Sequence, residues 1–156
     1  MISHCSSSVA IAIVSMRSED ADCLLALRME ARVGQLRKIR EAVRGAVESC
    51  GCSETPTADI VLAVDEACQN IIRHAYKGDP EGVIELDVRR QGDDLIICLL
   101  DLAPVIDPSK VKPRDLDDLR PGGLGTHFIQ KVMDRAYFLP RPGTDGNLLR
   151  MVKRIE

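Results

Sequence analysis

The spacing of hydrophobic residues predicts an opening strand followed by an amphipathic helix. A short apolar stretch runs from Leu24 to Met29, which suits a strand. After it, apolar residues recur at spacings of three or four, the period of one helix face. They are Val33, Leu36, Ile39, Val43, Val47 and Cys50. Charged residues between them would form the exposed face, and Gly51 stands where such a helix ends.

A second, longer helix is predicted between Thr55 and the Lys77-Gly78 pair. Thr55 is a suitable N-cap, and Pro56 suits the first helical position because proline has no N–H to leave unsatisfied. The core stripe of this helix would be Ile60, Val64, Ala67, Ile71 and Ala75. Glu66 and Asn70 lie off that stripe, four residues apart on one side of the helix, with Arg73 beside them. Such a pair is most often a solvated helix face, so it indicates chemistry only in combination.

Alternating apolar and polar residues then predict a β-hairpin. Ile84, Leu86 and Val88 alternate with charged residues, and a continuous apolar run from Leu95 to Leu100 follows a polar turn. Asp101 ends this second strand, and the ends of strands often carry binding or catalytic residues. The alternative for Asp101 is a strand terminator exposed to water.

A long proline-containing segment from Ala103 to Pro121 has no hydrophobic period, and it predicts a functional lid or a disordered stretch. The sequence Gly122-Gly123-Leu124-Gly125-Thr126 follows at the start of a third predicted helix. Glycines there let backbone N–H groups approach an anion, and the helix dipole favours negative charge. This turn therefore predicts phosphate binding, with a flexible lid hinge as the alternative. It is neither a P-loop nor a dinucleotide fingerprint. Two strands around 136–139 and 147–155 would complete the domain.

Composition and charge narrow the class of protein without naming it. The 156 residues, 45% hydrophobic and 29% charged, indicate one globular domain without an internal repeat. A net charge of −3 gives no footprint for direct nucleic-acid binding or for a polybasic membrane anchor. The apolar stretch from Val9 to Val14 is too short for a membrane span and lacks the basic residues of an export signal.

The six cysteines lack the C-x-x-C spacing of a zinc or redox site, so metal binding through them is not expected. Cys68 and Cys98 fall in apolar runs, where a thiol serves as a small hydrophobic group. This usage of cysteine favours a reducing cytoplasm.

Three motifs in a fixed order together resemble a known superfamily. They are the run from Val64 to Tyr76 (VDEACQNIIRHAY), then Asp101 after a strand, then the glycine turn before a helix. This order closely resembles the GHKL-type ATPases. More narrowly, it resembles the bacterial anti-sigma-factor serine-protein kinases, whose helix typically reads V-D-E-A-x-x-N-x-x-x-H-A-Y. The closing run from Gly146 to Arg154 is also similar to that group, and the resemblance spans about Leu24 to Ile155.

The resemblance implies a role for each matched residue. Asn70 would be the magnesium ligand, since an amide oxygen is a hard donor, and Glu66 would be the general base for a substrate hydroxyl. Asp101 would accept a hydrogen bond from the adenine amino group. Gly122, Gly123, Leu124, Gly125 and Thr126 would form the phosphate-binding turn. Arg73 and Ala103 are counted with the nucleotide-binding residues.

Two departures from the family pattern bear on nucleotide affinity. The family usually has D-x-G where this chain has Asp101-Leu102-Ala103, and the extra methyl group of Ala103 could crowd the base or stiffen the lid hinge. The threonine that the superfamily often uses near adenine has no secure counterpart, because Asn147 follows Gly146. His74 matches a family position, and we expect it to be a helix-packing residue.

The fold implied is α+β, a two-layer α/β sandwich (the GHKL or Bergerat ATP-binding fold). It has a mixed, mostly antiparallel sheet with about three helices on one face. Residues 1–22 would be an N-terminal extension and residues 23–156 the ATP-binding kinase domain.

The function implied is a cytoplasmic, magnesium- and ATP-dependent serine/threonine-protein kinase that regulates transcription as an anti-sigma factor. It would sequester a sigma factor and phosphorylate a small anti-anti-sigma (STAS-type) protein, with a homodimer plausible. The alternative is a catalytically weak or inactive partner-switching module. The catalytic half of a histidine kinase is disfavoured, because 156 residues leave no room for its phosphoacceptor helices.

Overall fold

A five-stranded sheet forms one layer of the protein. The computed structural model describes residues 21–104 and 123–155, and for residues 123–126 it describes the backbone only. The strands are β1 (Asp22–Glu30), β2 (Val83–Gln91), β3 (Asp94–Asp101), β4 (Arg135–Pro140) and β5 (Asn147–Arg154). Their order across the sheet is β1-β2-β3-β5-β4, and every pairing between these strands is antiparallel. The predicted strands and the hairpin are confirmed.

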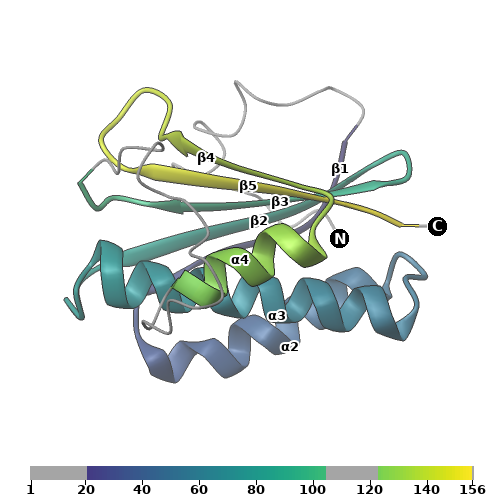
Figure 1. Cartoon of the computed structure of the whole chain (residues 1–156), viewed down its shortest axis with the longest axis horizontal. Helices are drawn as coiled ribbons and strands as arrows, with labels where there is room; N and C mark the ends of the chain where they lie inside the picture. Colours follow the sequence, from purple (N-terminus) through teal and green to yellow (C-terminus); the bar gives the residue numbers. More distant parts are fainter. Residues whose placement is uncertain (1–20, 105–122, 156) are drawn as a thin grey trace.

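Three helices form the second layer, on one face of the sheet (Figure 1). They are α2 (Leu36–Glu48), α3 (Glu54–Asn70) and α4 (Gly123–Val132). A short 3-10 turn, η1 (Val33–Gln35), precedes α2, and a π-helical turn, η2 (Ile71–Ala75), extends α3. Helix α3 lies between α2 and α4 and contacts both. The predicted two-layer α+β sandwich is confirmed. The lid and the stretch at 9–14 lie outside the described residues, apart from Ala103 and Pro104 at the start of the lid.

Helix α3 buries one broad side of its surface in the core. Its stripe of Ile60, Val64 and Ala67 packs into the core as predicted, and Val61, Ala63 and Cys68 are buried beside it. Ile39 and Val43 of α2 and Ile129 of α4 belong to the same cluster, together with the inward residues of the sheet. Burial of this much apolar surface fixes the rotation of α3, so its remaining open side is also fixed.

The structure corrects two details of the helix predictions. The N-cap of α3 is Ser53 rather than Thr55, which places Pro56 in the first turn but not at its first position. Proline is tolerated there because the first four N–H groups of a helix have no intrahelical partner. Val33 was predicted in the core stripe of the first helix, but it lies in η1 and is 66% exposed.

A buried ion pair holds the turn between β4 and β5 against the sheet. Arg141 Nη2 lies 3.0 Å from Glu85 Oε2, and both side chains are almost completely buried. The backbone N–H of Arg141 also donates to Gly146 O at 3.0 Å, which closes the turn that leads into β5. Within residues 21–104 and 123–155, Arg141 Nε and Nη1 have no hydrogen-bond partner. Glu85 is therefore the main charge that compensates this guanidinium.

We predict that Glu85→Ala lowers the free energy of unfolding by roughly 3–5 kcal/mol, because it leaves a buried arginine without its counter-charge. Urea denaturation of both proteins measures the difference. Glu81→Ala, at an exposed position just before β2, is the control and should change stability by less than about 0.5 kcal/mol. Equal effects of the two substitutions would contradict the importance of the buried pair.

Candidate functional site

The three sequence motifs lie at one end of the molecule. Figure 1 shows that the C-terminal half of α3, the end of β3 and the N-terminal end of α4 are at the same end. Helix α4 begins at Gly123 and packs against α3. The fold therefore brings the glycine-containing helix start to the helix that carries Glu66 and Asn70. Gly122 lies outside the described residues, and so do the side chains of Leu124 and Thr126.

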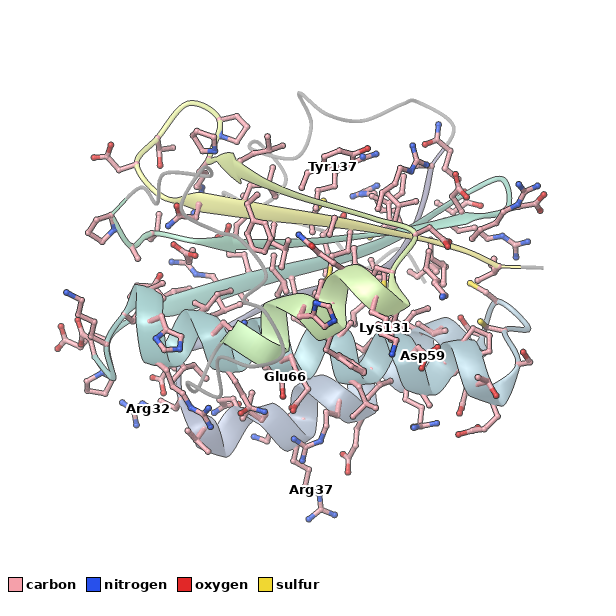
Figure 2. The ribbon with its side chains drawn as sticks, in the orientation of Figure 1. Arg32, Arg37, Asp59, Glu66, Lys131 and Tyr137 are labelled. Carbon is pink, nitrogen blue, oxygen red and sulfur yellow. The ribbon has the colours of Figure 1, made fainter. Side chains whose placement is uncertain are left out.

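Glu66 and Asn70 lie on the one side of α3 that the core leaves open. The residues along this side share partial or full exposure. They are Asp59, Leu62, Glu66, Asn70 and Arg73. Figure 2 labels Glu66 on α3, the helix against which α4 packs. Among the described residues, neither Glu66 nor Asn70 has a side-chain hydrogen bond or ion pair. This is the arrangement that the spacing of four predicted.

A chain of polar contacts secures the neighbouring side of α3 to α2. Asp65 accepts hydrogen bonds from Arg40 Nη1 at 2.8 Å and from Gln69 Nε2 at 2.7 Å. Gln69 Oε1 in turn accepts one from Arg73 Nη2 at 2.9 Å. The paired acidic residues Asp65 and Glu66 therefore differ in role, since one is committed to α2 and the other faces the open side. Arg73 is exposed with one nitrogen engaged, which leaves further donors for a phosphate.

Asp101 is buried, so its alternative as a solvent-exposed strand terminator is wrong. Its side chain is on the inner side of β3, and the residue is 4% exposed. Oδ1 accepts hydrogen bonds from the Ala103 N–H at 3.0 Å and from Asn147 Nδ2 at 2.9 Å. The backbone N–H of Asn147 also interacts with this carboxyl. A carboxylate accepts about four hydrogen bonds in all, so capacity remains for one more donor such as an exocyclic amino group.

The electrostatics of Asp101 reflect this burial. Burial is the largest influence and raises the pKa of the Asp101 carboxyl above its ordinary value. The hydrogen bonds from Asn147 and Ala103 and the charge of Arg141 act in the opposite direction. The pKa of a buried carboxyl held in this way depends on each of its donors.

Ala103 does not strain the turn after β3. Among the described residues, only Lys77 has a positive φ without being glycine, so Ala103 adopts ordinary backbone geometry. Its methyl group is buried at 3% exposure. Gly146, just before the neighbouring strand β5, is the glycine that this end requires: its φ is 134°, and a Cβ there would clash with Asp101 O. The close approach of Gly146 lets β5 bring Asn147 beside Asp101.

Sequence reasoning gave no role to Tyr76 or Asn147. The Tyr76 hydroxyl contacts the backbone of Val83 and of Leu102, which follows Asp101. Asn147 was noticed only as a departure from a threonine, whereas its side-chain amide donates a hydrogen bond to the Asp101 carboxylate. The Tyr76 contacts depend on how η2 packs against the sheet, and the spacing of hydrophobic residues in the sequence does not reveal such tertiary packing. His74, predicted to pack within the fold, is exposed.

The cysteine predictions that concern burial are confirmed. Cys68 and Cys98 are 0% and 5% exposed, and burial raises the pKa of the Cys68 thiol to about 12 and of the Cys98 thiol to about 11. Both remain protonated near neutral pH and behave as small apolar groups. No group of three or more potential metal-ligating side chains occurs in the described part of the chain.

Residues 29–153 match the family model described as the histidine kinase-like ATPase domain. Because the match spans most of the chain, the protein belongs to this family of ATPase domains, and the resemblance found in its sequence is confirmed. No helix in residues 21–104 or 123–155 has both the length and the apolar character needed to cross a membrane.

Individual relatives narrow the likeness further. The serine-protein kinase RsbW of Staphylococcus aureus is 28% identical over 137 residues, which cover 82% of this chain and 86% of the relative. The SiaB-SiaC complex of Pseudomonas aeruginosa contains a chain with a TM-score of 0.63 and 20% identity, covering 94% of this chain and 99% of that one. A Mycobacterium tuberculosis structure of RsbU and RsbW domains gives 0.61 and 18%, covering 84% of this chain and 31% of that one. At these identities the two structures establish a shared fold.

We predict that Asn147→Ala raises the pKa of Asp101 further, because the substitution removes an N–H donor that stabilises the charged carboxylate. The folded protein then binds this proton still more tightly than the unfolded chain, so the contribution of Asp101 to stability falls more as the pH rises through its pKa. Carboxyl-carbon NMR titration of Asp101 measures the shift. Asn70→Ala, which removes an amide without a bond to Asp101, should leave the pKa unchanged. An unchanged value in Asn147→Ala would contradict this hydrogen bond.

Proposed function

We propose that this chain is an ATP-dependent serine/threonine-protein kinase of the anti-sigma type. It phosphorylates a small anti-anti-sigma protein and sequesters a sigma factor. The observation that carries the proposal is that Glu66 and Asn70, which bond to no other described side chain, lie at the same end of the molecule as the start of α4 and the buried Asp101. The relative named as a serine-protein kinase supports the choice of a protein hydroxyl as acceptor.

Each residue of the site has a chemical task in this proposal. Asp101 accepts a hydrogen bond from the adenine amino group, and the backbone N–H groups from Gly122 to Gly125 bind the phosphates at the start of α4. Arg73, exposed on the same side of the helix as Glu66 and Asn70, adds a cation beside the phosphates. Ala103, Leu124 and Thr126 complete the nucleotide-binding set.

Glu66 is the proposed general base for phosphoryl transfer. The substrate hydroxyl oxygen forms a bond to the γ-phosphorus, the bond from that phosphorus to the β-phosphate oxygen breaks, and ADP leaves. The proton of the hydroxyl passes to the Glu66 carboxylate, which has no competing partner among the described residues. A carboxylate already engaged, such as Asp65, is less able to accept that proton.

Asn70 fits the role of magnesium ligand. Its amide oxygen is a hard donor, it has no hydrogen-bond partner within residues 21–104 and 123–155, and it lies one helical turn from Glu66. A bound magnesium ion would neutralise phosphate charge, and the protein contributes the position of that amide.

Several broader features belong to the same proposal. The kinase domain spans residues 23–156, and residues 1–22 are an extension of it. We place the protein in the cytoplasm, which the free thiols of Cys50, Cys52, Cys68 and Cys98 support. A homodimer, with no direct contact to nucleic acid or membrane, completes the proposed state.

A second candidate function is a partner-binding module that uses nucleotide only as a conformational ligand, or not at all. The alanine in place of the family's usual glycine at position 103 favours it. Calorimetric titration with Mg-ATP distinguishes the kinase from a module that uses no nucleotide, and phosphate incorporation distinguishes it from a module that only binds nucleotide. The kinase proposal requires heat of binding and a thermal shift at millimolar nucleotide.

We predict that Glu66→Ala retains binding of Mg-ATP but loses phosphoryl transfer by about 100-fold or more, because the general base is absent. Calorimetry measures binding, and phosphate incorporation measures transfer into the protein that co-purifies from cell extract and is identified by mass spectrometry.

Asp59→Ala is the matched control for this experiment. Asp59 is a half-buried carboxylate on the same side of α3, two turns before Glu66 (Figure 2). We expect it to leave both binding and transfer near the wild-type values. Parallel loss of binding and transfer in Glu66→Ala would count against a role as base.

A further inference from the structure

Tyr76 joins the helix that carries Glu66 and Asn70 to the turn that follows Asp101. Its hydroxyl donates to Val83 O at 2.6 Å, at the start of β2. The same hydroxyl accepts the backbone N–H of Leu102 at 2.8 Å, one residue beyond Asp101. The hydroxyl oxygen of Tyr76 thus links the end of the helix to the start of β2 and to the turn after β3.

The π-helical turn η2 sets the direction of this side chain. The backbone N–H of Tyr76 bonds to Ile71 O, five residues back, rather than to the residue four back as in an α-helix. The carbonyl of Ile72, which would accept the Tyr76 N–H in an α-helix, accepts a hydrogen bond from the Gly78 N–H. The wider turn therefore rotates Tyr76 relative to the stripe of α3, while Asn70 stays within the regular helix just before it.

Gly82 makes room for the ring. A Cβ at position 82 would lie 2.6–2.7 Å from three carbons of the Tyr76 ring, closer than real contacts allow. The ring is thus clamped against the backbone just before β2. Burial raises the pKa of the Tyr76 hydroxyl, which keeps it protonated and able to donate to Val83 O.

The turn after Asp101 has further attachments, and they differ in kind. The Asp101 carboxylate holds the N–H of Ala103, and Asn147 Nδ2 reaches both that carboxylate and Pro104 O. These bonds tie the turn to the sheet. Among the described residues, the Tyr76 hydroxyl links this turn to the helical layer, because it accepts the hydrogen bond from the Leu102 N–H.

We propose that Tyr76 is a positioning residue, which sets the base-binding turn at Asp101 relative to the metal- and phosphate-binding side of α3. This inference rests on the proposed nucleotide site. Tyr76 touches neither base nor phosphate in this role. It acts through its hydrogen bond with the Leu102 N–H. Its effect is therefore on the affinity for the base and not on the affinity for the phosphates.

The test compares Tyr76→Phe with the wild-type protein in binding three probes: Mg-ATP, Mg-ITP, which carries a carbonyl in place of the adenine amino group, and magnesium tripolyphosphate. We expect Tyr76→Phe to bind Mg-ATP about three- to tenfold more weakly, the effect of one lost hydrogen bond. Binding of Mg-ITP and of tripolyphosphate should stay near wild type. The preference for ATP over ITP should therefore narrow, which a general loss of stability would not produce.

Tyr137→Phe is the control, since Tyr137 is the one other tyrosine of the chain. It lies half exposed on the edge strand β4 and is labelled in Figure 2. It should bind all three probes like the wild type. Leu102→Pro is the second variant, because it deletes the N–H that Tyr76 accepts and keeps the tyrosine itself. It should narrow the same preference.

The outcomes separate this inference from the function on which it rests. A wild-type ATP preference in Tyr76→Phe, or an equal loss of all three probes, overturns the positioning role while the nucleotide site stands. Failure of the wild-type protein to bind Mg-ATP overturns the nucleotide site and this inference together.

Discussion

The packing of α3 between α2, α4 and the sheet is the constraint on which the rest of the structure depends. A helix packed in this way has one side left for chemistry, and burial of Ile60, Val64 and Cys68 fixes which side that is. Glu66 and Asn70 fall on it because they stand four residues apart and off the core stripe. The hydrophobic core thus orients the two polar groups, and the Asp65–Arg40 pair reinforces that orientation from the α2 side.

The opposite wall of the site follows from the sheet. Because β3 and β5 are antiparallel neighbours, Asp101 at the end of one strand faces Asn147 at the start of the other. Gly146 allows this approach, since any side chain there would meet the Asp101 carbonyl. The buried carboxylate, its amide donor and the Tyr76 hydroxyl then form one connected end of the molecule. In the proposed nucleotide site, this end of the molecule would recognise the base.

The sequence predicted most of this fold because hydrophobic periods report burial directly. The strands, the three helices and the open side of α3 all followed from spacing. The N-cap was misplaced because Ser53 and Thr55 are both capping residues, and Pro56 fits more than one position of a first turn. The burial of Asp101 could not be predicted, since it arises from strands that are distant in the sequence and pair in the sheet. The contacts of Tyr76 could not be predicted either, since a π-helical turn directs its side chain to a distant segment. The glycine turn was identified by composition, and its role remains a prediction.

In the proposed site, α3, the start of α4 and Asp101 surround one metal-bound nucleotide. NMR of the isotope-labelled protein with Mn-ATP tests this arrangement, because the paramagnetic ion broadens only nearby signals. We expect the signals of the Asn70 side-chain amide and of the backbone amides of Gly123 and Gly125 to broaden first, while the signal of Gly92 in the hairpin turn stays sharp. Broadening centred on that hairpin, or none beyond free Mn²⁺, would contradict it.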